Sequence, residues 1–128
     1  HNLSGASAPV RLRHMKHIAR SFSATVGPNV AELKPLRLLN RPIYRYPQGD
    51  KYRDVVDGAV FAFVQGTDPE VLLVVEAVKN SNDKALRWQY GLARMSMVPL
   101  QVSRDGKRVW TMDWERGNPA SSYYTIHH

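Results

Sequence analysis

The chain has 128 residues, 43% of them apolar, a formal net charge of +7 and no cysteine. This length fits one domain with one core, the lack of cysteine excludes disulfides and thiolate chemistry, and no window approaches the roughly 20 apolar residues of a membrane-spanning helix. The charge is uneven, because residues 1–53 hold ten Lys/Arg against two acids whereas residues 54–128 hold eight against nine.

The N-terminal region predicts a flexible end followed by a helix. Residues 1–8 are small and polar, as in mobile termini. An amphipathic helix is predicted over residues 9–25, opened by Pro9 and stopped by β-branched residues before Gly27-Pro28. Its apolar positions recur at three- and four-residue steps: Leu12, Met15, Ile18, Ala19 and Phe22.

Residues 29–56 predict an extended segment, because three prolines interrupt any regular helix or strand. We expect this segment to lie across a sheet. Its expected contacts are Leu36, Leu38, Leu39, Ile43 and Tyr44.

Residues 57–113 predict a sheet. Two apolar runs, 58–65 and 70–78, flank the turn-forming sequence QGTDPE and indicate a hairpin whose strands are covered on both faces. Further strands are predicted at 87–96, 98–104 and 107–113, and Asp105-Gly106 predicts a type I′ turn between the last two. A two-residue turn would pair Val102 with Val109 and Leu100 with Thr111.

The expected fold is α+β. A single domain, residues 9–128, would pack the N-terminal amphipathic helix on a curved, mainly antiparallel five-stranded sheet, with a tail over 114–128. A small β-barrel with the helix as its plug is the alternative.

One carboxylate, Glu76, falls in an otherwise apolar strand. A buried charge needs a partner, and Arg94 on the following strand is the expected one. This indicates either a structural ion pair or a ligand-binding site in which Glu76 and Arg94 orient a polar ligand between Trp88 and Tyr90. Asp50, Asp54 and Asp57 are close in sequence, and one of them could join Glu76 in acid/base chemistry.

The basic N-terminal part indicates either a solubilising surface or a polyanion site. The candidate polyanion-binding residues are Arg11, Arg13, Lys16, Arg20, Arg41 and Arg45. Interleaved tyrosines, including Tyr44 and Tyr46, fit either nucleic-acid stacking or packing. His14 and His17 have a spacing that suits a metal but lack further ligands nearby, so neither a metal nor a cofactor is predicted.

Three segments form a recurring order of motifs: NRPIYRY (40–46), DGAVFAFVQGTDPEVLLVVEA (57–77) and LARMSMVPLQVSRDGKRVW (92–110). In this order of motifs the chain resembles a family of uncharacterised domains from planctomycete-type bacteria. Some members have a His-Glu pair before the last hairpin, where this chain has Tyr90 and Gly91. The resemblance implies an exported bacterial protein. Independently of it, the start at His1 and the last residues, His127 and His128, suggest a trimmed chain with a tag remnant.

Three functions remain open from the sequence. The first is a non-enzymatic binding or interaction domain for an unknown ligand or protein partner. The second is a basic nucleic-acid-associated module using residues 11–53, and the third is an acid/base enzyme with a sheet cavity around Glu76. The shape of the sheet's concave face is the feature expected to decide among them.

Overall fold

The computed structural model describes residues 6–49, 54–80, 82, 85–114 and 123–127. Helix α1, Ala8–Arg20, begins one residue before the predicted start. Ser7 caps it by accepting a hydrogen bond from the Val10 backbone N–H at 3.4 Å, and Pro9 lies in its first turn, where its missing N–H costs nothing. Its buried residues are Met15, Ile18 and Ala19.

The helix ends earlier than the predicted residue 25. The Ser21 N–H bonds to the Ile18 carbonyl at 3.0 Å, and strand β1, Phe22–Val26, follows at once. In this strand Phe22, Ala24 and Val26 are buried while Ser23 is exposed, which is the two-residue period of a half-buried strand. Phe22 fits both this strand period and the helical spacing from Ile18 and Ala19, which explains why the predicted helix extended too far.

The segment after β1 contains the 3₁₀ turn Val30–Glu32 and three two-residue strands: β2, Lys34–Pro35, β3, Arg37–Leu38, and β4, Tyr44–Arg45. Strand β2 pairs with β1, whereas β3 and β4 pair with β5. The segment therefore runs along the edge of a sheet and not across its face. Leu36 and Leu38 pack against the core as expected, but Ile43 and Tyr44 are 51% and 53% exposed.

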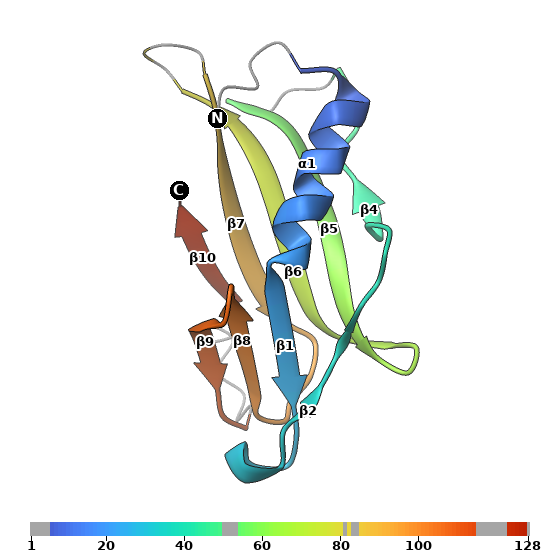
Figure 1. Ribbon diagram of the computed structural model, residues 1–128, viewed down its shortest axis with the longest axis vertical. Coiled ribbons are helices and arrows are strands. Elements are labelled where there is room, and N and C mark those ends of the chain that lie inside the picture. Colours follow the sequence, from blue (N-terminus) through green and yellow to red (C-terminus); the bar gives the residue numbers. More distant parts are fainter. Residues whose placement is uncertain (1–5, 50–53, 81, 83–84, 115–122, 128) are drawn as a thin grey trace.

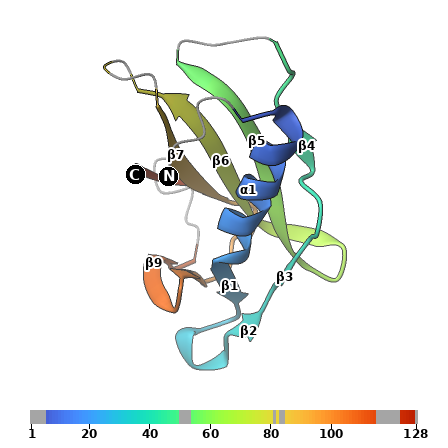
Figure 2. The same ribbon diagram turned by 45° about the horizontal axis from the view of Figure 1, so that its top comes forward.

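Two antiparallel sheets form the body of the molecule (Figures 1 and 2). The large sheet has the order β10-β7-β6-β5-β3, with β4 also paired to β5. The small sheet has the order β2-β1-β8-β9, so the last predicted hairpin leaves the meander and joins β1. The remaining strand bounds are β5, Val55–Gln65, β6, Asp68–Lys79, β7, Leu86–Arg94, β8, Leu100–Arg104, β9, Lys107–Met112, and β10, Tyr123–His127.

The β8–β9 hairpin has the predicted turn but a different register. Asp105 and Gly106 have φ angles of 50° and 81°, as a type I′ turn requires. Val102 faces Trp110 and Leu100 faces Met112, with a register shift next to Ser103. The predicted pairs are therefore wrong by one residue, because a β-bulge adds a residue to β9.

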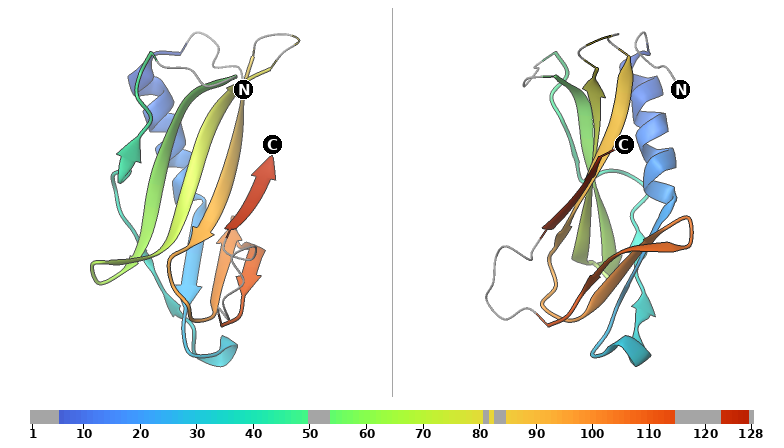
Figure 3. Two further views of the ribbon diagram at one scale, coloured as in Figure 1. Left: turned by 180° about the vertical axis from the view of Figure 1, so that it is seen from behind. Right: turned by 90° about the vertical axis from the view of Figure 1, so that its left-hand side faces the viewer.

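Helix α1 lies on one face of the large sheet, which curves around it (Figure 3). The edge strands β10 and β3 do not pair with each other, so the sheet stays open as a half-barrel and differs from the alternative of a small closed barrel. The predicted α+β fold, one helix on a curved antiparallel sheet, is confirmed. Side chains fill most of the concave face, including Met15, Phe22, Phe61, Phe63, Leu73, Leu92 and Val102. No helix in the described ranges is long and apolar enough to span a lipid bilayer.

Candidate functional site

A pocket of about 390 Å³ opens between α1 and the beginning of β7, at the end of the concave face that the core does not fill. We call it the α1–β7 pocket. Six aromatic or basic side chains from three elements line it: His14, His17, Arg87, Trp88, Tyr90 and Arg104. Two aliphatic side chains, Ile18 and Leu86, complete the lining.

The periodicities of the chain bring these side chains together. His14, His17 and Ile18 are three and four residues apart and share one face of α1. Leu86, Trp88 and Tyr90 alternate along β7 and so point to one side of the sheet.

Arg104 reaches the pocket from the last residue of β8. The Asp105 N–H at the hairpin tip bonds to the Ser21 carbonyl at 2.8 Å. This contact holds the hairpin against the end of α1, and it thereby sets the position of Arg104.

An aromatic stack forms one wall. The His14 and Trp88 rings lie with centroids 5.0 Å apart and an interplanar angle of 12°. Burial and the nearby His17 lower the pKa of His14, so the neutral imidazole is favoured at neutral pH. Trp88 Nε1 is buried and has no hydrogen-bond partner in the described part of the chain. An unpaired buried donor is uncommon and costs about 1–3 kcal/mol.

Arg104 is held in place by its contacts with Tyr90 and Phe22. Its guanidinium lies 4.9 Å from the Tyr90 ring centroid and 5.5 Å from that of Phe22, and Nη1 donates to the Tyr90 hydroxyl at 2.9 Å. Phe22 and Tyr90 are themselves edge-to-face at 4.8 Å. These contacts fix a cation in a wall of the pocket.

The lining is basic. Two arginines and two histidines contribute to it, whereas none of the described lining residues is an Asp or a Glu. Such a pocket suits an anion, because a guanidinium offers paired donors to a carboxylate or a phosphate.

Trp88 and Tyr90, two of the four residues predicted to bind a ligand, line this pocket, but Glu76 and Arg94 do not. Arg94 is buried and faces Val71, and its guanidinium donates to the carbonyls of Ser96 and Val98, both at 2.8 Å. Glu76 lies on the opposite face of the large sheet, because its neighbours in the strand, Val75 and Ala77, point to the α1 side.

The expected Glu76–Arg94 ion pair is therefore wrong. The strand register places Glu76 beside Gln89 and not beside Arg94. The carboxylate accepts hydrogen bonds from the Tyr46 hydroxyl and from Gln89 Nε2, both at 2.6 Å. Burial is the main cause that raises the pKa of Tyr46, and the hydrogen bond to Glu76 raises it further. Tyr46 also crosses directly over Gly58, where an added Cβ would collide with its ring.

A second charged cluster surrounds Asp57, which is 1% exposed. Its carboxylate accepts bonds from Arg11 Nε at 2.8 Å, from Arg45 Nε and Nη2 at 2.8 and 2.5 Å, from Gln48 Nε2 at 3.1 Å and from the Gly58 N–H at 2.8 Å. Burial alone would raise the pKa of Asp57, but these donors outweigh burial and lower the pKa to about 2. The cluster ties α1, β4 and β5 together. Asp57 is therefore a structural carboxylate, and its bonds to Arg11 and Arg45 make it unavailable to join Glu76 in acid/base chemistry.

The Asp57 cluster also changes the predicted polyanion surface. Arg11 and Arg45 are both bound to Asp57, whereas Arg13, Arg20 and Arg41 are exposed and Lys16 is half-buried. Neither Asp50 nor residues 51–53 lie within the described part, so the expected role of Asp50 is outside it.

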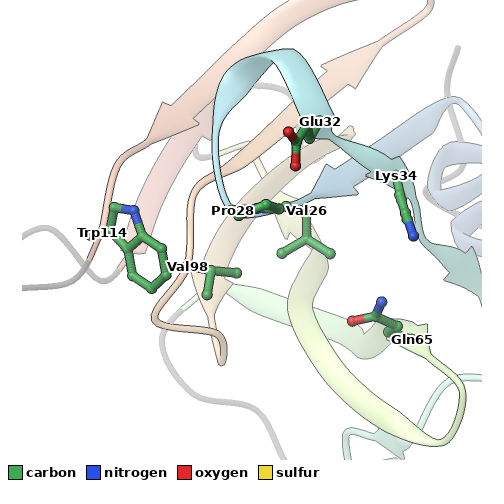
Figure 4. Close-up of a pocket in the computed structure, with 8 residues that line it drawn as sticks. Val26, Pro28, Glu32, Lys34, Gln65, Val98 and Trp114 are labelled. Carbon is green, nitrogen blue, oxygen red and sulfur yellow. The ribbon is translucent and has the colours of Figure 1, made fainter.

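Another pocket, of about 280 Å³, lies at the far end of the small sheet (Figure 4). Val26, Val98 and Trp114 supply its apolar side, and Glu32 and Lys34 stand at its rim. The two charges are of opposite sign and both residues are exposed, so this pocket favours neither an anion nor a cation.

A metal site is not evident around the histidines. No group of three His, Cys, Asp or Glu side chains comes together within the described residues, and His14 stacks on Trp88 instead. His128 lies outside the described residues.

Comparisons of the chain with protein-family models, with curated proteins and with solved structures find no match.

Proposed function

We propose that this protein is a non-enzymatic binding domain whose small ligand occupies the α1–β7 pocket. One observation carries the proposal: aromatic and cationic side chains from α1, β7 and β8 converge on one hollow beside a filled core. Ligand pockets typically combine an apolar or aromatic lining with a few polar groups that fix orientation.

The size of the pocket supports the same function. A volume of about 390 Å³ falls in the range of roughly 300–1,000 Å³ that is usual for small-molecule sites. The pocket beside Trp114, at about 280 Å³, falls below it. The lining offers positioning groups, Tyr90 and Arg104, that are held by the fold.

A screen of small aromatic compounds by ligand-detected NMR tests the proposal. We expect some compounds to bind both the native chain and Trp114→Leu, which alters the pocket beside Val26 and Val98, but not Trp88→Leu. Circular dichroism establishes that both variants are folded. The proposal is contradicted if folded Trp88→Leu binds the same compounds as the native chain, or if binding is lost in Trp114→Leu instead.

A basic nucleic-acid-associated module is the second candidate. Three exposed arginines, Arg13, Arg20 and Arg41, favour it, although Arg11 and Arg45 are bound to Asp57. Titration with random DNA at two salt concentrations tests this function, because phosphate binding weakens steeply with salt. The module predicts a strongly salt-dependent affinity that falls in Arg13→Gln, and an affinity unaffected by salt would contradict it.

A further inference from the structure

We propose that the α1–β7 pocket takes a planar aromatic molecule that carries one carboxylate or phosphate group. This inference rests on the proposed binding function and adds the chemistry of the ligand. Its starting point is the composition of the pocket, in which aromatic side chains and cations alternate around one opening.

The cations argue for an oxyanion. Arg87 is an exposed lining residue whose side chain makes no hydrogen bond or ion pair within the described part of the chain. Because Arg87 alternates with Trp88, its side chain starts on the opposite face of the sheet, and its guanidinium reaches an anion in the pocket by bending around β7 near the first residue of that strand. Arg104 stands on the wall with its orientation fixed by Tyr90 and Phe22. Charge-assisted hydrogen bonds from guanidinium groups are the strongest that a protein offers to a carboxylate or a phosphate.

The aromatic side chains argue for a flat ligand. The parallel His14 and Trp88 rings and the buried Tyr90 ring present π surfaces, against which a planar ring packs in an offset or edge-to-face arrangement. The unpaired Trp88 Nε1–H gives the same wall a donor that a ligand oxygen can satisfy after a small shift of the indole.

His14 links binding to pH. It stacks on Trp88 and shares the lining of the pocket with His17, Arg87, Tyr90 and Arg104. Burial, and to a lesser extent the nearby His17, lower the pKa of His14, whereas a bound anion favours the charged imidazole. Anion binding is therefore expected to be accompanied by proton uptake at His14, and affinity is expected to rise as pH falls.

Calorimetric titration of the whole chain with matched naphthalene compounds tests the ligand class. Naphthoate and naphthyl phosphate carry the oxyanion, naphthamide is the neutral isostere of naphthoate, and inorganic phosphate lacks the ring. We expect naphthoate or naphthyl phosphate to bind about tenfold or more tightly than naphthamide and inorganic phosphate. The stronger of the two anions identifies the preferred group.

Two arginine variants supply the matched comparison. Arg87→Gln is expected to weaken the anionic ligand about tenfold and to leave naphthamide unchanged, whereas Arg13→Gln, an exposed arginine on the same helix as the histidines, changes neither. The affinity of naphthoate, but not of naphthamide, should also rise as pH falls from about 7 to below about 6.5, because the pKa of His14 is lowered from 6.5 in the free protein and naphthoate stays ionised.

The outcomes separate this inference from the binding function. If naphthamide binds as tightly as the anions and is lost in Trp88→Leu, the binding function stands and the inferred anion is wrong. If inorganic phosphate alone binds as tightly as naphthyl phosphate, the aromatic part of the inference is wrong. If neither naphthalene anion binds, the inference is wrong, and the compound screen decides the binding function.

Discussion

At the scale of single residues, Asp57 holds three segments of the chain together. Its carboxylate binds Arg11 of α1 and Arg45 of β4 at the start of β5, and it is almost completely buried. Removing the charge of a buried carboxylate with two guanidinium partners destabilises the folded protein, because the partners are left without a counter-charge.

Asp57→Asn is expected to lower the free energy of unfolding by about 3 kcal/mol at neutral pH. Asp54→Asn is the matched control, because Asp54 is exposed and should change stability by less than about 0.5 kcal/mol. Urea denaturation of both variants measures the difference. An Asp57→Asn variant as stable as the native chain would contradict the structural role of the cluster.

The ionisation of Asp57 predicts that the stability of the protein depends on pH. The pKa of Asp57 is lowered from 3.8 to about 2 in the folded protein. The folded state then binds fewer protons than the unfolded one, so the stabilisation is complete above about pH 4 and is lost as pH falls towards 2. The stability gap between the native chain and Asp57→Asn should narrow over this interval, and a constant gap would contradict it.

At the scale of elements, strand β1 is the feature that the sequence did not reveal. Burial alternates from Phe22 through Val26, and β1 joins the small sheet by pairing with β8. The alternation covers only five residues and overlaps the end of the helical pattern, so no period could be assigned to it from the sequence.

Placing a carboxylate at two successive positions of β1 tests this alternation. Ala24→Asp buries a charge on the core side and is expected to cost several kcal/mol, about 3 or more. Ser23→Asp faces solvent and should cost less than about 1 kcal/mol. Thermal unfolding of both variants makes the comparison, and equal effects would mean that residues 22–26 are not a half-buried strand.

The strands β5 to β9 could be predicted from their apolar runs and from the turn residues between them. Gly66, Asp105 and Gly106 all have positive φ angles, as such turns require. The pairing of these strands within the two sheets could not be predicted. The bulge in β9 shifts the hairpin register, and the strand register separates Glu76 from Arg94. Both depend on contacts between segments, which strand periodicity does not contain.

At the scale of the whole molecule, the concave face is the feature on which the proposed function rests. It is filled by core side chains along most of its length, and a pocket opens in it beside Trp88 and Tyr90. The sequence predicted that these two residues contact a ligand, because they lie in one predicted strand, 87–96, in which alternate residues share a face. The contribution of α1 and β8 to the pocket was not predictable, because it depends on the packing of the hairpin tip against Ser21.

The indole N–H signals of the protein offer the most direct test of the binding function. The chain has three tryptophans, Trp88, Trp110 and Trp114, whose signals in a nitrogen–proton correlation spectrum can be assigned by single Trp→Phe substitutions. Trp88 lines the α1–β7 pocket and Trp114 lines the other one. During titration with a compound that the screen identifies as a binder, the Trp88 signal should shift in a saturable way while the Trp110 and Trp114 signals stay in place. A shift confined to Trp114, or no shift at any of the three, would contradict the assignment of the binding site.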